Sequence, residues 1–93
     1  MTAQAGYDKD IAIGYLESVG SRRDDGKFHE IDGMLVTDNH RQTISKWERL
    51  AVIPLGRFDE ILLAYGLMLW QYEDWANDTH GTDGYYDPLM EAA

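Results

Sequence analysis

The chain of 93 residues has no cysteine, only two prolines and no long apolar run. The absence of cysteine excludes a disulfide framework, a thiolate zinc site and a cysteine nucleophile. No stretch approaches the roughly 20 apolar residues that a membrane-spanning helix needs. The N-terminus has neither a basic segment nor an apolar one, so we expect no signal peptide and a cytoplasmic protein.

Positive charge is scarce and unevenly distributed. Seventeen acidic residues against eight basic ones give a formal net charge of −9. Residues 1–36 carry a net −3, residues 37–57 carry +2, and residues 58–93 carry −8 without any lysine or arginine. Binding to phosphate needs local positive charge, so this balance argues against a general nucleic-acid coat and against a protein of anionic membranes. Only residues 37–57, the basic centre of the chain, have the positive charge that such binding needs.

The remaining composition is that of one small globular domain, residues 1–93. A hydrophobic content of 44% and an aromatic content of 12% suffice for a modest core. Apolar residues recur at helical spacing over residues 8–19, 40–50 and 55–74. Residues 28–36 fit either a two-turn helix or a short strand pair. These patterns together predict an all-α domain of four to five helices.

Local signals mark where the helices begin and end. Residues 37–39 (Thr-Asp-Asn) are an N-cap cluster in front of the second helix. We expect Gly66 to divide the last helical segment in two. Residues 21–26 and the tail from Asn77 have the composition of loops. The inner face of the second helix is predicted to carry Ile44, Trp47 and Ala51.

One motif suggests a function. Residues 42–49 (Gln-Thr-Ile-Ser-Lys-Trp-Glu-Arg), with Pro54 behind them, resemble the recognition helix of the phage lambda repressor/Cro-type helix-turn-helix family. Residues 58–67 are similar to the fourth helix of that family, so the resemblance covers residues 42–67 and implies a helix-turn-helix-like region over about 28–67. The sequence departs from the family at the turn, where Asp38 and Asn39 replace a glycine and an aliphatic residue.

The resemblance implies a small, non-catalytic transcription regulator of phage or mobile-element origin, which binds double-stranded DNA as a homodimer. Such a recognition helix presents amide, hydroxyl and basic side chains to the major groove. Gln42 could then read adenine, Arg41 could read guanine or hold a phosphate, and Lys46 would contact the backbone. The residues that the resemblance assigns to DNA binding are His40, Arg41, Gln42, Thr43, Lys46 and Arg49.

The C-terminal segment, residues 68–93, mixes aromatic and acidic side chains and suggests a second interpretation. The chain could be an acidic inhibitor or DNA mimic that binds a basic surface of a host or viral protein instead of DNA. For Trp70, packing in the core is the stronger interpretation. The residues assigned to a partner or dimer interface are Trp70, Tyr72, Trp75, Tyr85 and Tyr86.

Enzymatic chemistry finds no support in the sequence. The three histidines include no pair at the His-x-x-x-His spacing of a zinc site, so we expect neither a metal nor another cofactor. No phosphate-binding loop, dinucleotide fingerprint or nucleophile-elbow frame is present. We therefore expect a protein that is not an enzyme.

Overall fold

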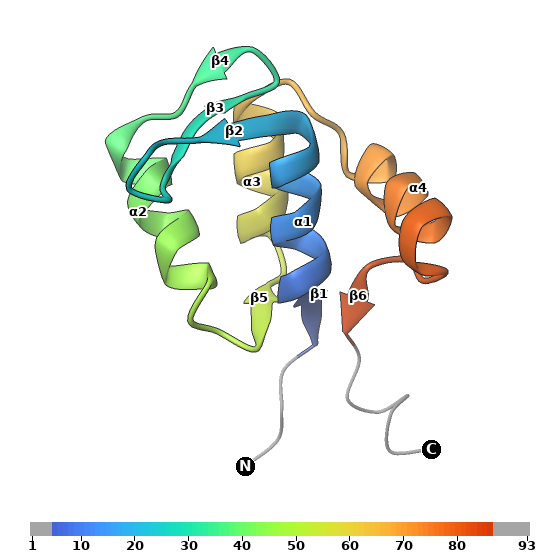
Figure 1. Cartoon of the computed structure of the whole chain (residues 1–93). Coiled ribbons are helices and arrows are strands. Elements are labelled where there is room, and N and C mark those ends of the chain that lie inside the picture. The colour runs from blue at the N-terminus through green and yellow to red at the C-terminus, as the bar shows by residue number, and fades with distance from the viewer. Residues whose placement is uncertain (1–4, 87–93) are drawn as a thin grey trace.

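The structure is a computed structural model that describes residues 5–86 (Figure 1). Helices make up about 50% of it and strands 21%, so the prediction of an all-α domain is wrong. In chain order the elements are β1 (Gly6–Asp8), α1 (Lys9–Val19), β2 (Gly20–Arg22), β3 (Phe28–Ile31), β4 (Met34–Leu35), α2 (Asp38–Trp47), β5 (Val52–Pro54), α3 (Arg57–Ala64), α4 (Leu69–His80) and β6 (Tyr85–Tyr86).

The strands form two antiparallel sheets of three strands each. The first has the order β5-β1-β6, so the first strand of the chain is its centre, and Tyr7 pairs with both Ile53 and Tyr85. The second sheet, β2-β3-β4, lies at the other end of α1 (Figure 1). Of the two alternatives for residues 28–36, the strand pair is therefore confirmed.

This second sheet changes the surroundings of α2. The segment expected to be a recognition helix follows β4 and is followed by β5, whereas a helix-turn-helix places another helix directly before it across a short turn. The expected helix-turn-helix core is thus not found among residues 5–86. Ala51, expected on the inner face of this helix, lies beyond its end and is exposed.

Helices α1 and α2 lie where the sequence predicts them. Helix α1 begins after Asp8, whose carboxylate accepts a hydrogen bond from the Ile11 amide at 3.1 Å. Helix α2 begins after Thr37, whose hydroxyl accepts one from the His40 amide at 3.2 Å. Gly66, at a φ of 76°, lies in the break between α3 and α4.

The tail from Asn77, predicted as a loop, is helical to His80, because the left-handed residue that ends α4 is Gly81, and β6 follows it. Residues 21–22 of the predicted loop over 21–26 belong to β2.

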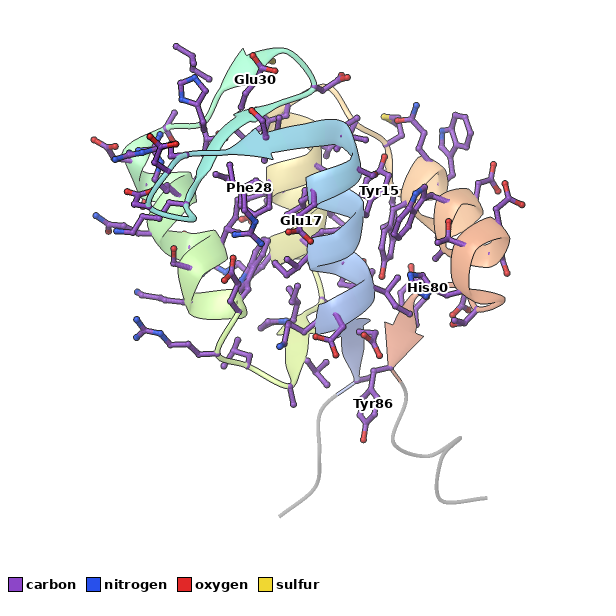
Figure 2. The ribbon with its side chains drawn as sticks, in the orientation of Figure 1. Tyr15, Glu17, Phe28, Glu30, His80 and Tyr86 are labelled. Carbon is purple, nitrogen blue, oxygen red and sulfur yellow. The ribbon has the colours of Figure 1, made fainter. Side chains whose placement is uncertain are left out.

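The core is rich in aromatic residues. Phe58 packs between Tyr7 and Tyr72, with ring centroids 5.0 and 4.8 Å away. Tyr15 lies between α1 and α4, where its ring is 5.5 Å from that of Tyr72 (Figure 2). Aromatic pairs at these separations add to the free energy gained by burying their surface. This core joins α1, α3 and α4 to the first sheet and leaves the outer face of α2 free.

Candidate functional site

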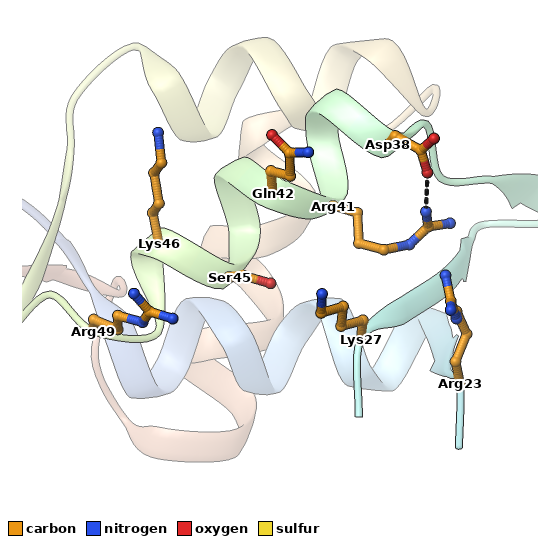
Figure 3. A pocket seen from close by; sticks show the side chains of 8 residues that line it. All are labelled: Arg23, Lys27, Asp38, Arg41, Gln42, Ser45, Lys46 and Arg49. Atoms are coloured by element: carbon orange, nitrogen blue, oxygen red, sulfur yellow. Dashed lines mark hydrogen bonds and ion pairs between the residues drawn. The ribbon is translucent and has the colours of Figure 1, made fainter. Parts of the chain in front are cut away.

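A hollow of about 390 Å³ lies between α2 and the turn that joins β2 to β3 (Figure 3). We call it the basic hollow. Five of its eight lining residues are basic and one is acidic, which gives a local charge of +4 in a chain of net charge −9. The lining residues are Arg23, Lys27, Asp38, Arg41, Gln42, Ser45, Lys46 and Arg49.

The sequence of α2 explains one wall of the basic hollow. Ile44 and Trp47 are 1% and 3% exposed, so they fix the helix on the core by its inner face. Residues three and four positions apart share a helix face, which places the polar residues of α2 together on the opposite side. In Figure 3, Gln42 and Lys46 point away from the β2–β3 turn, whereas Ser45 points into the space between α2 and this turn.

The other wall is the β2–β3 turn. The Arg23 amide donates to the Lys27 carbonyl at 2.6 Å, and the Gly26 amide donates to the Arg23 carbonyl at 2.9 Å. Gly26 has a φ of 83°, a conformation that glycine adopts without strain. The closed turn therefore presents Arg23 and Lys27 from its two ends toward α2.

Arg41 is a structural residue of this site. Its guanidinium donates to the Phe28 carbonyl at 2.8 Å, to the Val36 carbonyl at 2.9 Å and to the Asp38 carboxylate. Only 14% of the side chain is exposed. These bonds tie α2 to the second sheet. Arg41 is therefore not free to read guanine, the role that the sequence suggested for it.

Arg22 fixes the turn from the other side. It donates to Glu17 of α1 at 2.9 Å and to Glu48 at the end of α2 at 3.1 Å, and it lies 4.4 Å from the ring centre of Phe28. Burial alone would lower the pKa of Arg22, but the hydrogen bonds to these two carboxylates outweigh it and raise the pKa. Arg22 thus connects the turn to two helices.

Three of the acidic residues around the basic hollow are already paired. Asp38 pairs with Arg41, Glu48 with Arg22, and Asp25 with Arg23 at 2.9 Å. The backbone amide of Lys27 and then the neighbouring cations hold the pKa of Asp25 below its usual value.

This pairing leaves three cations whose charge is not compensated. Lys27, Lys46 and Arg49 make no ion pair with any residue in the described part of the chain. They are also exposed to solvent. The face between α2 and the β2–β3 turn is therefore positive.

The six residues predicted to bind DNA divide into two groups. Arg41, Gln42, Lys46 and Arg49 line the basic hollow. His40 does not, because its Nδ1 lies 2.8 Å from the Tyr65 hydroxyl at the junction of α2 with α3. Thr43 does not either, because its hydroxyl donates to the Asn39 carbonyl at 3.0 Å.

Sequence reasoning missed Arg23, Lys27 and Ser45. The two cations lie in or beside a stretch that was assigned only as a polar loop. A pair of neighbouring arginines with a lysine four residues later was the available signal. It could not be placed beside α2 without the pairing of β2 with β3.

The aromatic residues of the C-terminal segment do not form one surface. Tyr72 is fully buried, and its hydroxyl donates to the Gly84 carbonyl at 2.8 Å. Trp75, Tyr85 and Tyr86 are half-buried, whereas Trp70 is 58% exposed, contrary to its expected place in the core. The role of this segment in a homodimer or a partner complex stays a prediction, and residues 87–93 lie outside the described part.

No family model, curated protein or solved structure matches this chain. None of the helices within residues 5–86 is long and apolar enough to cross a membrane. The same residues contain no group of three or more histidine, aspartate or glutamate side chains placed to hold a metal ion. The arguments about function therefore rest on the chemistry of the basic hollow.

Proposed function

We propose that this protein is a small, non-catalytic, cytoplasmic regulator of transcription that binds double-stranded DNA through the basic hollow. The observation that carries the proposal is the gathering of five of the chain's eight basic residues around one hollow. Guanidinium and ammonium groups are the side chains that contact phosphate, and an amide side chain can bond to base edges.

The arrangement of α2 supports this function. An α-helix fits the major groove of B-DNA, and α2 exposes Gln42 and Lys46 on the side away from its packed face (Figure 3). The β2–β3 turn stands beside the helix and could contact the sugar–phosphate backbone. This assignment needs no helix-turn-helix, since it depends only on an exposed helix with flanking cations.

The acidic residues outside the basic hollow restrict the orientation in which DNA can bind. Residues 58–93 contain no lysine or arginine and carry a net −8, so DNA is repelled from the elements that they form. Attraction is confined to the face where Lys27, Lys46 and Arg49 lie. A chain with a net charge of −9 can therefore still bind a polyanion in one orientation.

The test is binding to a random pool of labelled duplex DNA at 50 and 200 mM salt, with sequencing of the retained duplexes. If the three uncompensated cations contact two or three phosphates, affinity should fall about 12- to 40-fold between these concentrations. Lys46→Gln should weaken binding at low salt and reduce the slope of log affinity against log salt by about 0.9.

Arg57→Gln is the matched control, because Arg57 is exposed on α3 outside the basic hollow and, among residues 5–86, pairs only with Glu60 at 3.5 Å. It changes the net charge by the same amount and should leave the affinity nearly unchanged. No retention at 50 mM salt, or equal losses for both variants, would contradict the proposal.

The acidic face of α4 favours the second candidate, a protein that binds a basic partner. Trp70, Asp74 and Asp78 are all exposed and follow one another at four-residue spacing, so they share one helix face. Retention of duplex DNA separates the two functions, because a protein that binds a basic partner instead of DNA should retain none at 50 mM salt. If DNA is the partner, Trp70→Ala should bind DNA as the unchanged protein does; loss of DNA binding would assign α4 to the interface.

A further inference from the structure

A second hollow, of about 690 Å³, lies beside the basic hollow. Arg22, Asp25, Gly26 and Glu48 belong to the second hollow alone. Three residues line both hollows, and they are Lys27, Ser45 and Arg49. These three therefore lie where the β2–β3 turn meets the C-terminal half of α2. We call them the seam residues.

The geometry of the seam residues follows from their positions. Ser45 lies in the last turn of α2, and Arg49 lies just beyond its end, in a turn where the Arg49 amide donates to the Lys46 carbonyl at 3.0 Å. Figure 3 shows the Ser45 hydroxyl directed into the space between α2 and the turn, with Lys27 and Arg49 on its two sides. An ammonium, a hydroxyl and a guanidinium thus converge from two elements.

None of these three side chains makes a hydrogen bond or an ion pair with another residue in the range 5–86. The acidic neighbours, Asp25 and Glu48, are held by Arg23 and Arg22 instead. An anion that enters the seam therefore meets donors that are not yet engaged. A tetrahedral phosphate group, with several acceptor oxygens, can bond to all three donors at once.

We propose that Lys27, Ser45 and Arg49 form a clamp for a single phosphodiester of the DNA backbone. The clamp deepens the proposed function and rests on it. Gln42 and Lys46 point to the outer side of α2, so the seam contacts the strand beside the groove that the helix enters. The clamp supplies position and affinity, and the outer face of α2 supplies any sequence preference.

The clamp makes a distinctive prediction, because two cations share one phosphate. The double variant Lys27→Gln/Arg49→Gln should reduce the slope of log affinity against log salt by about 0.9, the value for one phosphate. Lys27→Gln alone should leave the slope nearly unchanged, because Arg49 still contacts the same phosphate, whereas Lys46→Gln alone should reduce it by about 0.9. The two single variants remove the same charge, so each controls for the other.

Ser45→Ala adds a test that leaves the charge unchanged. It should weaken duplex binding about tenfold, because a hydrogen bond to a charged group is lost, and it should leave the retained DNA sequences the same. Alanine favours the helix, so the variant should fold, which circular dichroism checks. A changed sequence preference would place Ser45 at a base edge and overturn its part in the clamp.

Inorganic phosphate distinguishes the phosphodiester of DNA from a free phosphate as the ligand. We expect weak, millimolar displacement of DNA by phosphate, with amide shifts at Ser45 and Gly26 in NMR spectra. Micromolar, saturable phosphate binding would overturn the phosphodiester assignment. A slope loss of about 0.9 for Lys27→Gln alone, or of about 1.8 for Lys27→Gln/Arg49→Gln, would overturn the clamp alone. No DNA binding by the unchanged protein would overturn the proposed function as well.

Discussion

At the scale of single residues, Arg41 shows how the surroundings of a side chain decide its role. The sequence places it on the exposed face of a helix, among residues suited to contact DNA. Its guanidinium instead donates to Phe28, Val36 and Asp38, which belong to three different segments. Arg41 therefore positions α2 against the second sheet, and its effect on a ligand acts through that placement.

Arg41→Met should lower the free energy of unfolding by about 2–3 kcal/mol, because two backbone carbonyls lose their charged donor. Urea denaturation measures this change. Lys46→Met, an exposed position on the same helix, is the control and should change stability by no more than about 0.5 kcal/mol. Equal stability of the two variants would show that Arg41 does not hold the helix.

Gly84 is the second residue whose identity the structure requires. Its φ is 82°, and an added Cβ would lie 2.3 Å from the Tyr72 hydroxyl oxygen. Gly84→Ala should therefore cost about 2–4 kcal/mol, from backbone strain together with a clash in the core.

Gly81→Ala is the matched control for this substitution. Gly81 has a similar φ of 71°, but nothing lies within 4 Å of an added Cβ. Only the backbone strain remains, which costs about 1–2 kcal/mol. Thermal unfolding of the two variants should separate the contribution of the clash, and equal losses would place Tyr72 away from Gly84.

At the scale of elements, helices could be predicted, whereas the only strands proposed were the pair within residues 28–36, as one of two alternatives. The spacing of apolar residues located α1 and α2, and the N-cap cluster at residues 37–39 marked the start of α2, because those signals are local. The strands are two to four residues long, too short to show an alternating pattern. Their existence depends on partners far away in the chain, as when Tyr7 pairs with Ile53.

The candidate site was also predictable only in part: most of the residues in or next to α2 were identified, and those of the β2–β3 turn were not. Gln42, Lys46 and Arg49 were found together because the resemblance to the helix-turn-helix family assigns all three to DNA binding. Lys27 reaches the same surface only because β3 folds back beside α2, and this proximity leaves no trace in local sequence. Arg41 was found but misjudged, because its acceptors are backbone carbonyls, which a sequence does not reveal.

At the scale of the whole molecule, the core depends on tyrosines that stay protonated. Burial raises the pKa of Tyr72 well above its ordinary value, and the charge of Asp8 acts in the same direction. Burial also raises the pKa of Tyr7, as does the hydrogen bond that its hydroxyl donates to Asp59 at 2.5 Å. A phenolate at either position would be a charge inside the core.

This core should make the protein sensitive to alkali. Each pKa is higher in the folded than in the unfolded state, so the stabilisation is complete below the unfolded pKa of about 10 and is lost as pH rises above it. The expected loss is at most about 1.4 kcal/mol per pH unit for each tyrosine. Urea denaturation between pH 8 and 11 measures it.

The control for this prediction is the double variant Tyr7→Phe/Tyr72→Phe, which cannot ionise at either position. Its stability should fall less steeply above pH 10 than that of the unchanged protein. Parallel curves for the two proteins would show that other groups cause the alkaline sensitivity.

The place of β1 at the centre of the first sheet has a consequence for how the protein is made. One neighbour of this strand is β5, and the other is β6 at Tyr85–Tyr86. The residues of β1 therefore leave the ribosome long before those of β6 are synthesised. During this time, the edge of β1 that pairs with β6 has no partner. The first sheet is complete only after residue 86 has left the exit tunnel, so we expect this sheet to form after all of residues 5–86 have been synthesised.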